Sequence, residues 1–164
     1  MTTFIAYVVV FLLAATPFFE MIAVIPLGVA AGLHVVPVTI LAFAGNVVTV
    51  LLVILLINQI QAWLKRRREA KGKDGDSKRE GRAKKVWKRF GLPGLAIAGP
   101  FFIGSHLAAL MGMSFGGTKK RMAVWMVGSL TIWCLVTAVA SHIGIDLLFN
   151  HTDREGFLVD YLER

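Results

Sequence analysis

Glu20 and His106 are ionisable residues inside the two apolar stretches that prolines and glycines interrupt. Glu20 stands between Phe19 and Met21, and it is the only acidic residue in the first 64 residues. Burying an ionised carboxylate in hydrocarbon costs several kcal/mol, so such a residue is neutral, paired or facing water. We expect Glu20 to take up and release a proton. The alternatives are an anchor at a membrane interface or a cap at a helix N-terminus.

His106 follows Gly104 and Ser105 in a second apolar stretch, which prolines and glycines interrupt as they do around Glu20. Histidine titrates closest to physiological pH, so it could serve as a proton-exchange partner. If the two interrupted stretches meet near the middle of a membrane, Glu20 and His106 face one cavity. A histidine that is hydrogen-bonded within its own stretch is an equal alternative.

From the other polar residues of the apolar stretches we expect no metal site and no bound cofactor, and we do not expect the protein to be an enzyme. Asn46 is expected either to line the same cavity or to bond a neighbouring helix. His142 and Asp146 lie one helical turn apart, but two ligands are too few for a metal, so we expect a structural hydrogen bond. The single cysteine, Cys134, is expected to serve packing. No phosphate-cradling loop, HExxH zinc motif or GxSxG elbow occurs in the sequence.

Composition predicts a membrane protein. The 164 residues are 56% hydrophobic, which is too apolar for a soluble domain of this size. The net charge of +8 is concentrated in residues 65–89, which hold most of the lysines and arginines, whereas residues 1–64 hold none. Short loops rich in Lys and Arg stay on the cytoplasmic side of a bilayer. We therefore expect a basic cytoplasmic loop, with a mobile interior at residues 72–81.

Residues 4–33 are apolar over a greater length than one bilayer crossing requires. Two prolines and two glycines interrupt them: Pro17, Pro26, Gly28 and Gly32. Because such residues weaken helices, we predict a helix and then a broken or re-entrant element over residues 20–32. After an outer connection at residues 34–37, residues 38–60 should form a transmembrane helix that ends on the cytoplasmic side.

Residues 92–115 form a second apolar stretch, and the basic residues that follow it indicate its topology. A single crossing would place Lys119, Lys120 and Arg121 outside, against the positive-inside tendency, whereas a re-entrant hairpin returns them to the cytoplasm. Helix breakers favour the hairpin, because they divide the stretch into arms that are too short to span. They are Pro93, Gly94, Gly99, Pro100, Gly104 and Gly112. Residues 122–145 should form a second transmembrane helix.

Each half therefore consists of a broken or re-entrant helical element followed by a transmembrane helix, and the two halves cross in opposite directions. We predict an all-α integral membrane protein made of two inverted halves. Two short echoes accompany this pattern: Pro-Phe-Phe at residues 17–19 and 100–102, and a glycine with a polar neighbour at 45–46 and 128–129. One membrane domain would comprise an N-terminal half at 1–64, the basic loop at 65–89, a C-terminal half at 90–149 and a polar tail at 150–164.

The basic residues are expected to anchor the chain on the cytoplasmic side, and contact with anionic lipid headgroups is the more specific alternative. The candidates for headgroup contact are Lys84, Lys85, Lys88, Lys119, Lys120 and Arg121. Nucleic-acid binding is not expected, because the basic residues lie between membrane segments and only Trp87 and Phe90 offer stacking faces.

Three stretches resemble the small multidrug export family of bacterial membrane proteins. They are EMIAVIPLGVAAGL at residues 20–33, AGN at 44–46 and RFGLPGLAIAGPFFIGSHLAALMGM at 89–113, with the basic segment before the third. The most informative motif is Glu20, five variable residues and then Pro-Leu-Gly. The resemblance runs from about residue 17 to residue 144, which is most of the chain.

That family looks related to the wider DedA-like superfamily, whose members are associated with two opposed re-entrant hairpins and with translocation of lipid carriers. The resemblance implies hairpins that contain Glu20, Pro26, Gly28, Pro100, Gly104 and Gly112. This chain departs from the family pattern at Ile22, where an Arg is common, and in the second hairpin, which lacks a fuller Pro-x-Pro-Gly pattern. The missing Arg removes a natural partner for Glu20 and for a phosphate.

We expect a small multi-pass transporter of the inner membrane, which exports small amphipathic compounds with proton coupling or translocates a lipid carrier. Its transport residues would be Glu20, Pro26, Gly28, Asn46, Pro100, Gly104, Ser105 and His106. The expected partners are membrane lipids, the substrate and further copies of the chain, because so few spanning segments struggle to enclose a path. The alternative is a non-transporting scaffold or regulator that acts through the basic loop. Substrate, coupling ion, direction, oligomer number and the side of the N-terminus are left open.

Overall fold

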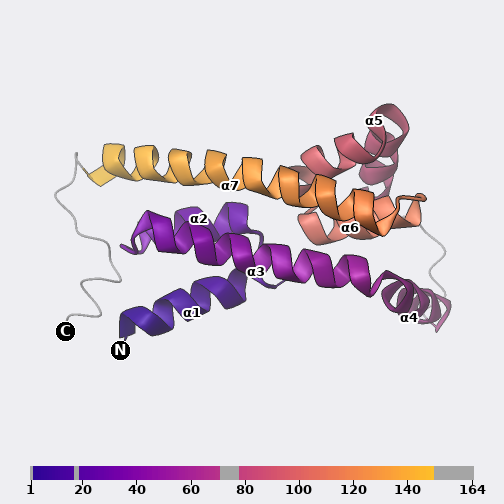
Figure 1. Ribbon diagram of the computed structural model, residues 1–164, viewed down its shortest axis with the longest axis horizontal. Coiled ribbons are helices and arrows are strands. Elements are labelled where there is room, and N and C mark those ends of the chain that lie inside the picture. The colour runs from indigo at the N-terminus through magenta and orange to yellow at the C-terminus, as the bar shows by residue number, and fades with distance from the viewer. Residues whose placement is uncertain (1, 17–18, 71–77, 150–164) are drawn as a thin grey trace. The chain divides into compact units, whose positions relative to one another are not determined.

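The computed structural model describes residues 2–16, 19–70 and 78–149, which form helices and no strand (Figure 1). The helices are α1 (Thr2–Ala14), α2 (Met21–Ala30), α3 (Val35–Leu55), α4 (Ile57–Ala70), α5 (Lys78–Phe102), α6 (Ser105–Ser114) and α7 (Lys119–Phe149). The predicted all-α class is confirmed. The chain divides into two compact units, a first of residues 1–48 and 130–164 and a second of residues 49–129.

Two helices among the described residues are long and apolar enough to cross a membrane, α3 over Val35–Leu55 and α7 over Lys119–Gly144. The 21 residues of α3 extend for about 31 Å at 1.5 Å per residue, which matches the roughly 30 Å hydrocarbon core of a bilayer. By the same measure α1, with 13 residues, and α2 and α6, with 10 each, are too short to cross.

In the first unit, α1 and α2 pack against each other as a hairpin of short helices. Glycines allow the neighbouring helices to approach this hairpin closely. A Cβ atom on Gly28 of α2 would lie 2.9 Å from Cγ1 of Val38 in α3. A Cβ atom on Gly45 of α3 would lie 2.5 Å from the carbonyl oxygen of Phe11 in α1. Small residues at helix contacts are typical of packing in membranes, where close approach maximises van der Waals contact.

The predicted interruption of the first apolar stretch is confirmed, but the break points differ. α1 ends at Ala14 and α2 begins after Glu20, so no single straight helix forms. α2 runs on through Pro26, whereas the chain leaves it at Gly32, which has a φ of 92°. A helix can accommodate a proline at the loss of one hydrogen bond, but a positive φ favours a residue without a Cβ atom.

In the second unit, α5 and α6 form the corresponding hairpin and pack against each other. α5 kinks at Gly91 (φ 63°, ψ −153°), which divides it into a first arm of residues 78–90 and a second arm of residues 92–102. The chain then reverses at Gly104, whose φ is 96°. The two arms predicted for this stretch are present as packed helices, whereas their re-entrance into a membrane stays a prediction. The helix continues through Pro93 and Pro100 and breaks only at glycines.

Two segments repeat the same local structure 84 residues apart: α2 with the start of α3, and α6 with the start of α7. The short helices have 10 residues each and begin at Met21 and Ser105. The long helices begin at Val35 and Lys119. The starts and ends of the short helices and the starts of the long helices all keep this offset, which is a stronger correspondence than the short sequence echoes provide.

The turns between the paired helices are built in the same way. Gly32 (φ 92°) and Gly116 (φ 100°) are both in the left-handed region. The amide that follows each glycine donates to the carbonyl of Gly28 or Gly112, at 3.1 and 2.9 Å. This six-to-one hydrogen bond is typical of a Schellman cap, which satisfies carbonyl groups at the end of a helix.

The buried faces of the two long helices also correspond. Completely buried residues recur at every fourth position at the start of each helix, at Val38, Ala42 and Asn46 in α3 and at Met122, Met126 and Leu130 in α7. This alignment pairs Asn46 with Leu130, one residue away from the sequence echo that pairs it with Ser129. The local structure therefore corrects the register of the repeat by one position.

Both long helices begin earlier than the sequence predicted. α3 begins at Val35, because Pro37 falls in its first turn, where the missing N–H group has no helical partner to lose. It ends at Leu55, and α4 follows from Ile57, so the helix predicted to reach residue 60 is divided. The predicted connection at residues 34–37 shifts accordingly, and α7 begins at Lys119 rather than at residue 122.

Part of the basic segment is helical. α4 continues to Ala70 and α5 begins at Lys78, so the last four positions of the interior predicted to be mobile are helical. Packing gives this arm a reason to fold, because the rings of Trp87 and Phe115 lie 5.5 Å apart. Residues 71–77 and the polar tail at 150–164 lie outside the described residues, so the predictions made for them stay predictions.

The close approach at Gly45 generates a stability prediction. Gly45→Ala should lower the melting temperature of the detergent-solubilised protein, because the new Cβ atom would press on the Phe11 backbone at a cost of about 1–3 kcal/mol. Gly128→Ala in α7 is the matched control, because its Cβ atom would meet nothing within 4 Å. Equal melting temperatures for the two variants would contradict the packing of α3 against α1.

Candidate functional site

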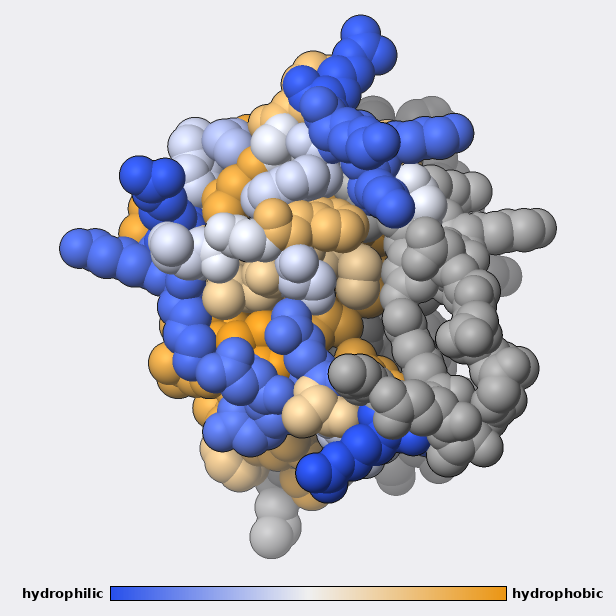
Figure 2. Space-filling model, turned by 90° about the vertical axis from the view of Figure 1, so that its right-hand side faces the viewer, coloured by the Kyte–Doolittle hydropathy of each residue, from blue (hydrophilic) through white to orange (hydrophobic). Residues whose placement is uncertain are grey.

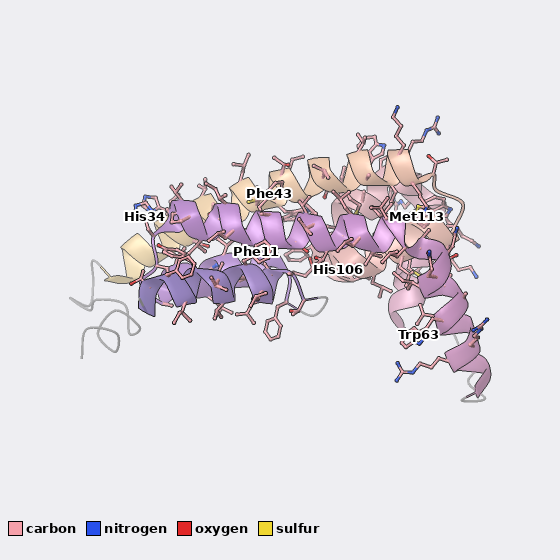
Figure 3. All side chains as sticks on the ribbon, turned by 60° about the horizontal axis from the view of Figure 1, so that its bottom comes forward. Phe11, His34, Phe43, Trp63, His106 and Met113 are labelled. Carbon is pink, nitrogen blue, oxygen red and sulfur yellow. The ribbon has the colours of Figure 1, made fainter. Side chains whose placement is uncertain are left out.

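His106 lies in the first turn of α6 in the second unit (Figure 3). Its position follows from Gly104, whose positive φ lets the chain turn from α5 directly into α6. The side chain is 7% exposed. Its Nε2 atom lies 2.9 Å from Oγ1 of Thr49, and its Nδ1 atom lies 3.3 Å from Oγ of Ser105. We call Thr49, Ser105 and His106 the histidine cluster.

The histidine cluster can accept either protonation state of the imidazole. A neutral imidazole donates through one nitrogen and accepts through the other, whereas an imidazolium donates through both. A hydroxyl group can donate or accept, so the hydroxyls of Thr49 and Ser105 can adapt to each form. The two hydroxyls can therefore keep both ring nitrogens hydrogen-bonded in either tautomer of the imidazole.

Sequence reasoning identified Ser105 and His106 but missed Thr49. Thr49 is a single hydroxyl residue in an apolar run, 57 residues before the histidine it contacts, and no motif marks it. One weak signal was available: Thr49 follows Asn46 by three positions, the spacing of neighbours on one helical face. Of the two alternatives for His106, the hydrogen bonds place it within its own unit, and any contact with Glu20 stays a prediction.

Glu20 is the N-cap residue of α2 in the first unit. Its backbone is extended (φ −72°, ψ 148°), and its carbonyl accepts from the amides of Ala23 and Val24 at 2.9 and 3.1 Å. Its side chain makes no capping hydrogen bond with the helix and is partly buried. The positive end of a helix dipole favours a carboxylate at this position. The cap position expected as one alternative therefore describes where Glu20 lies.

Glu20 and His106 lie at equivalent ends of the repeat. Glu20 is the N-cap of α2 and Gly104 is the N-cap of α6, at the same 84-residue offset as the helix boundaries. His106 is two residues beyond this cap. Both ionisable residues of the apolar stretches therefore stand at the N-terminal ends of short helices, where backbone N–H groups lack helical partners.

The other predicted transport residues lie in α2 and in the neighbouring helices α3 and α5. In the first unit, Pro26 and Gly28 are in α2, and Asn46 is completely buried in α3. In the second unit, Pro100 is buried at the end of α5, directly before the turn at Gly104. Each predicted set is therefore assembled around one short-helix hairpin.

The hydroxyls on the buried face of α7 have structural roles in the first unit. Thr137 and Ser141 donate to carbonyls four residues earlier in their own helix, at 2.6 and 2.7 Å. Sequence reasoning did not single them out. Cys134 is 6% exposed, and its Sγ atom lies 3.9 Å from the carbonyl oxygen of Thr39 in α3. That burial agrees with the packing role predicted for the cysteine.

The basic residues of the second unit are mostly exposed. Hydrophilic side chains project around an apolar centre in Figure 2. Lys84, Lys85 and Lys88 on α5 are exposed, as are Lys120 and Arg121. Lys119 differs, because its Nζ atom donates to the carbonyl of Leu55 at 2.8 Å and so satisfies the C-terminal end of α3. Lys119 therefore has a structural role in addition to the headgroup contact predicted for it.

Within the described part of the chain, no group of three or more His, Cys, Asp or Glu side chains could hold a metal. His142 is exposed on α7, whereas the Asp146 side chain falls outside the described residues, so the predicted contact between them stays a prediction. Outside the membrane stretches, Nδ1 of His34 lies 3.4 Å from the amide of Val36, and the amide of His34 donates to the Tyr7 hydroxyl at 3.3 Å. These contacts hold the turn between α2 and α3.

Residues 20–136 match the model of the protein family described as "Putative small multi-drug export protein". The match begins at Glu20, so it leaves out α1; it contains α2 to α6 and residues 119–136 of α7, which is most of the chain. Neither the curated proteins nor the solved structures gave a match. Together with two helices that are long and apolar enough to cross a bilayer, the family match indicates a membrane location.

The histidine cluster generates a second stability prediction. Thr49→Val should lower the free energy of unfolding by about 1–3 kcal/mol, because it removes one partner of a buried hydrogen bond. Thr39→Val is the matched control on the same helix, because the buried Oγ1 atom of Thr39 has no hydrogen-bond partner among the described residues. Thermal denaturation in detergent should show a loss for Thr49→Val and no loss for Thr39→Val. The reverse order would contradict the cluster.

Proposed function

Because the chain belongs to the small multi-drug export family, we propose that it exports small amphipathic compounds across the inner membrane, with ionisable residues of its short-helix hairpins taking part in transport. The observation that carries this proposal is the equivalent placement of Glu20 and His106. Each lies at the N-terminal end of a helix that is too short to span, one in each copy of the structural repeat. Transporters commonly bind substrates and coupling ions at such half-helix ends.

The proposed topology places both hairpins within the membrane as re-entrant elements. At 1.5 Å per residue the 10 residues of α2 or α6 reach about 15 Å, half of the hydrocarbon core. A re-entrant α5–α6 hairpin keeps the basic arm of α5 and Lys119 to Arg121 on one side, which the positive-inside rule makes cytoplasmic. A re-entrant α1–α2 hairpin puts the N-terminus on the opposite side.

In this topology α3 and α7 cross the membrane in opposite directions, which makes the 84-residue repeat an inverted one. The matched helix boundaries and turn glycines support that arrangement. Opposed hairpins of this kind also support the proposed relation to the DedA-like superfamily. Inverted repeats allow alternating access, because two halves of similar structure can exchange the open and closed roles on opposite faces of the membrane.

Glu20 is the proposed proton carrier and His106 its partner. A carboxyl group can be neutral while it faces hydrocarbon and ionised while it faces water, so one proton can be exchanged for each substrate. The histidine cluster supports a proton-linked role, because its hydroxyls can bond both forms of the imidazole. With Ile22 in place of the Arg common in the family, nothing at this point favours phosphate-bearing substrates.

A homo-oligomer completes the proposal. The described residues provide two helices that can cross a membrane, and two crossings with two re-entrant hairpins enclose little space. Further copies of the chain would supply the remaining wall of the path. A non-transporting scaffold that acts through the basic segment is the alternative that the transport experiment distinguishes.

Transport by proteoliposomes tests the proposal. Purified protein should move ethidium, a small amphipathic cation, when a pH gradient is imposed. Glu20→Gln should reduce the rate at least tenfold, because the amide cannot exchange a proton at this position, and His106→Gln should reduce it severalfold. Glu80→Gln in the first arm of α5 and His142→Gln in α7 make the same chemical changes outside the short helices α2 and α6, and both variants should transport at the wild-type rate.

Protein amount and monodispersity are checked by gel filtration before the rates are compared. Wild-type transport by Glu20→Gln would overturn the proton-carrier role. The complete absence of gradient-driven transport by the folded wild-type protein, with any of a panel of amphipathic cations and anions, would favour the scaffold.

A further inference from the structure

The two arms of α5 enclose a cleft beside the kink at Gly91. Its volume is about 520 Å³, within the roughly 300–1,000 Å³ typical of small-molecule sites. Two buried side chains, Leu95 and Ile103, contribute apolar surface to it. Ala98 and the exposed Phe102 also line the cleft. The lining from the second arm is therefore apolar throughout.

The first arm contributes a positive charge to this cleft. Lys85 lines it and is exposed, so its ammonium group can reach both the cleft and the surrounding solvent. Lys84 and Lys88 are exposed on the same arm, and the Arg89 guanidinium lies 5.2 Å from the Phe90 ring. Val86 adds apolar surface from the first arm, so the cleft is apolar on both sides with one charged residue, Lys85, at its lining. A ligand that matches it has an apolar chain and an anionic head.

We propose that this cleft binds one acyl chain of an anionic phospholipid, with the lipid phosphate against Lys85. The surroundings favour a lipid, because Ile97, Phe101 and Phe102 on the second arm are exposed apolar residues suited to contact with hydrocarbon. Anionic lipids of the cytoplasmic leaflet are attracted to basic helices next to the membrane. A zwitterionic lipid would match the apolar wall but not the charge of the first arm.

A second copy of the chain is a poorer occupant on electrostatic grounds. Each copy carries a net charge of +8, concentrated in the same basic segment, so two such surfaces repel each other. The lipid supplies the opposite charge instead. The proposed site contains none of the residues assigned to transport, so this inference goes beyond the proposed function, and it rests on that proposal only for the cytoplasmic placement of the first arm.

The bound lipid would hold the kinked helix at the membrane surface. The first arm of α5 carries the lysines and the second arm enters the apolar stretch, so one lipid bridges the polar and apolar sides of the kink. Trp87 of the first arm packs on Phe115 in the same unit, and this aromatic contact would help to fix the depth of the first arm at the membrane surface. The lipid would thus determine where the α5–α6 hairpin enters the membrane.

Native mass spectrometry of the full-length protein tests the site, with phosphatidylglycerol and phosphatidylcholine titrated separately. The protein should bind phosphatidylglycerol more tightly. Lys85→Gln should weaken that binding about fivefold, as expected for one cationic contact near a lipid surface. Ala98→Phe should weaken it similarly without any change of charge, because the ring fills the cleft. Arg66→Gln, which removes an exposed charge on α4 away from the cleft, should change it by less than twofold.

Circular dichroism checks that each variant is folded. Because Lys85 is exposed, Lys85→Gln should not disturb the packing of the core. Equal weakening by Lys85→Gln and Arg66→Gln would mean that lipids are attracted only by the overall charge, and would overturn the site. Unchanged phosphatidylglycerol binding by folded Ala98→Phe would show that the acyl chain does not bind in the cleft. If Ala98→Phe changed the number of protein copies in the oligomer but not the number of bound lipids, the cleft would be an interface between protein copies instead of a lipid site.

Discussion

Backbone N–H and C=O groups without partners are costly wherever water is excluded, and the C-terminal ends of the short helices α2 and α6 avoid this cost in the same way. Each helix ends in a glycine with positive φ, and the next amide returns a hydrogen bond to the helix, at 3.1 Å after α2 and 2.9 Å after α6. The chain can then turn into a long helix without exposing the final carbonyls. The matched ends of the short helices and the start of both long helices depend on these two caps.

The N-terminal ends of the same helices are where chemistry becomes possible. Glu20 stands at the cap of α2, and His106 lies in the first turn of α6 with hydroxyl groups at both ring nitrogens. A helix start provides partial positive charge and open N–H groups, so it suits an ionisable residue in an otherwise apolar setting. Because the chain belongs to the small multi-drug export family, we propose that these two residues take part in transport.

The sequence was informative wherever one residue type has a single strong physical effect. Lysine and arginine in residues 65–89, and the prolines and glycines of the apolar stretches, predicted the two interruptions and the second hairpin. Prolines were less informative about position, because α2 continues through Pro26 and α5 through Pro100, whereas the chain turns at Gly32 and Gly104. A positive φ depends on the turn that the surrounding chain needs, and a single sequence does not contain that information.

Tertiary contacts were harder to predict than breaks. Thr49 contacts His106 because α6 packs beside the end of α3 in the second unit. No local sequence pattern links the two residues, so this contact could not be predicted. The kink at Gly91 joins a basic helix to an apolar one, whereas the sequence suggested a loop next to a membrane segment. Packing of Trp87 on Phe115 stabilises that arm, and such a contact across 28 positions has no periodic signal.

The central claim of this account is that the α5–α6 hairpin enters and leaves the membrane on one side. Labelling of intact cells with an impermeant thiol reagent tests it most directly, using single cysteines at His34, Lys84 and Thr118 in a Cys134→Ala background. The account predicts labelling at position 34 from outside and protection at 84 and 118 until the cells are opened. Labelling at 118 from outside, with 84 protected, would show an ordinary crossing by residues 92–115 and would contradict the account.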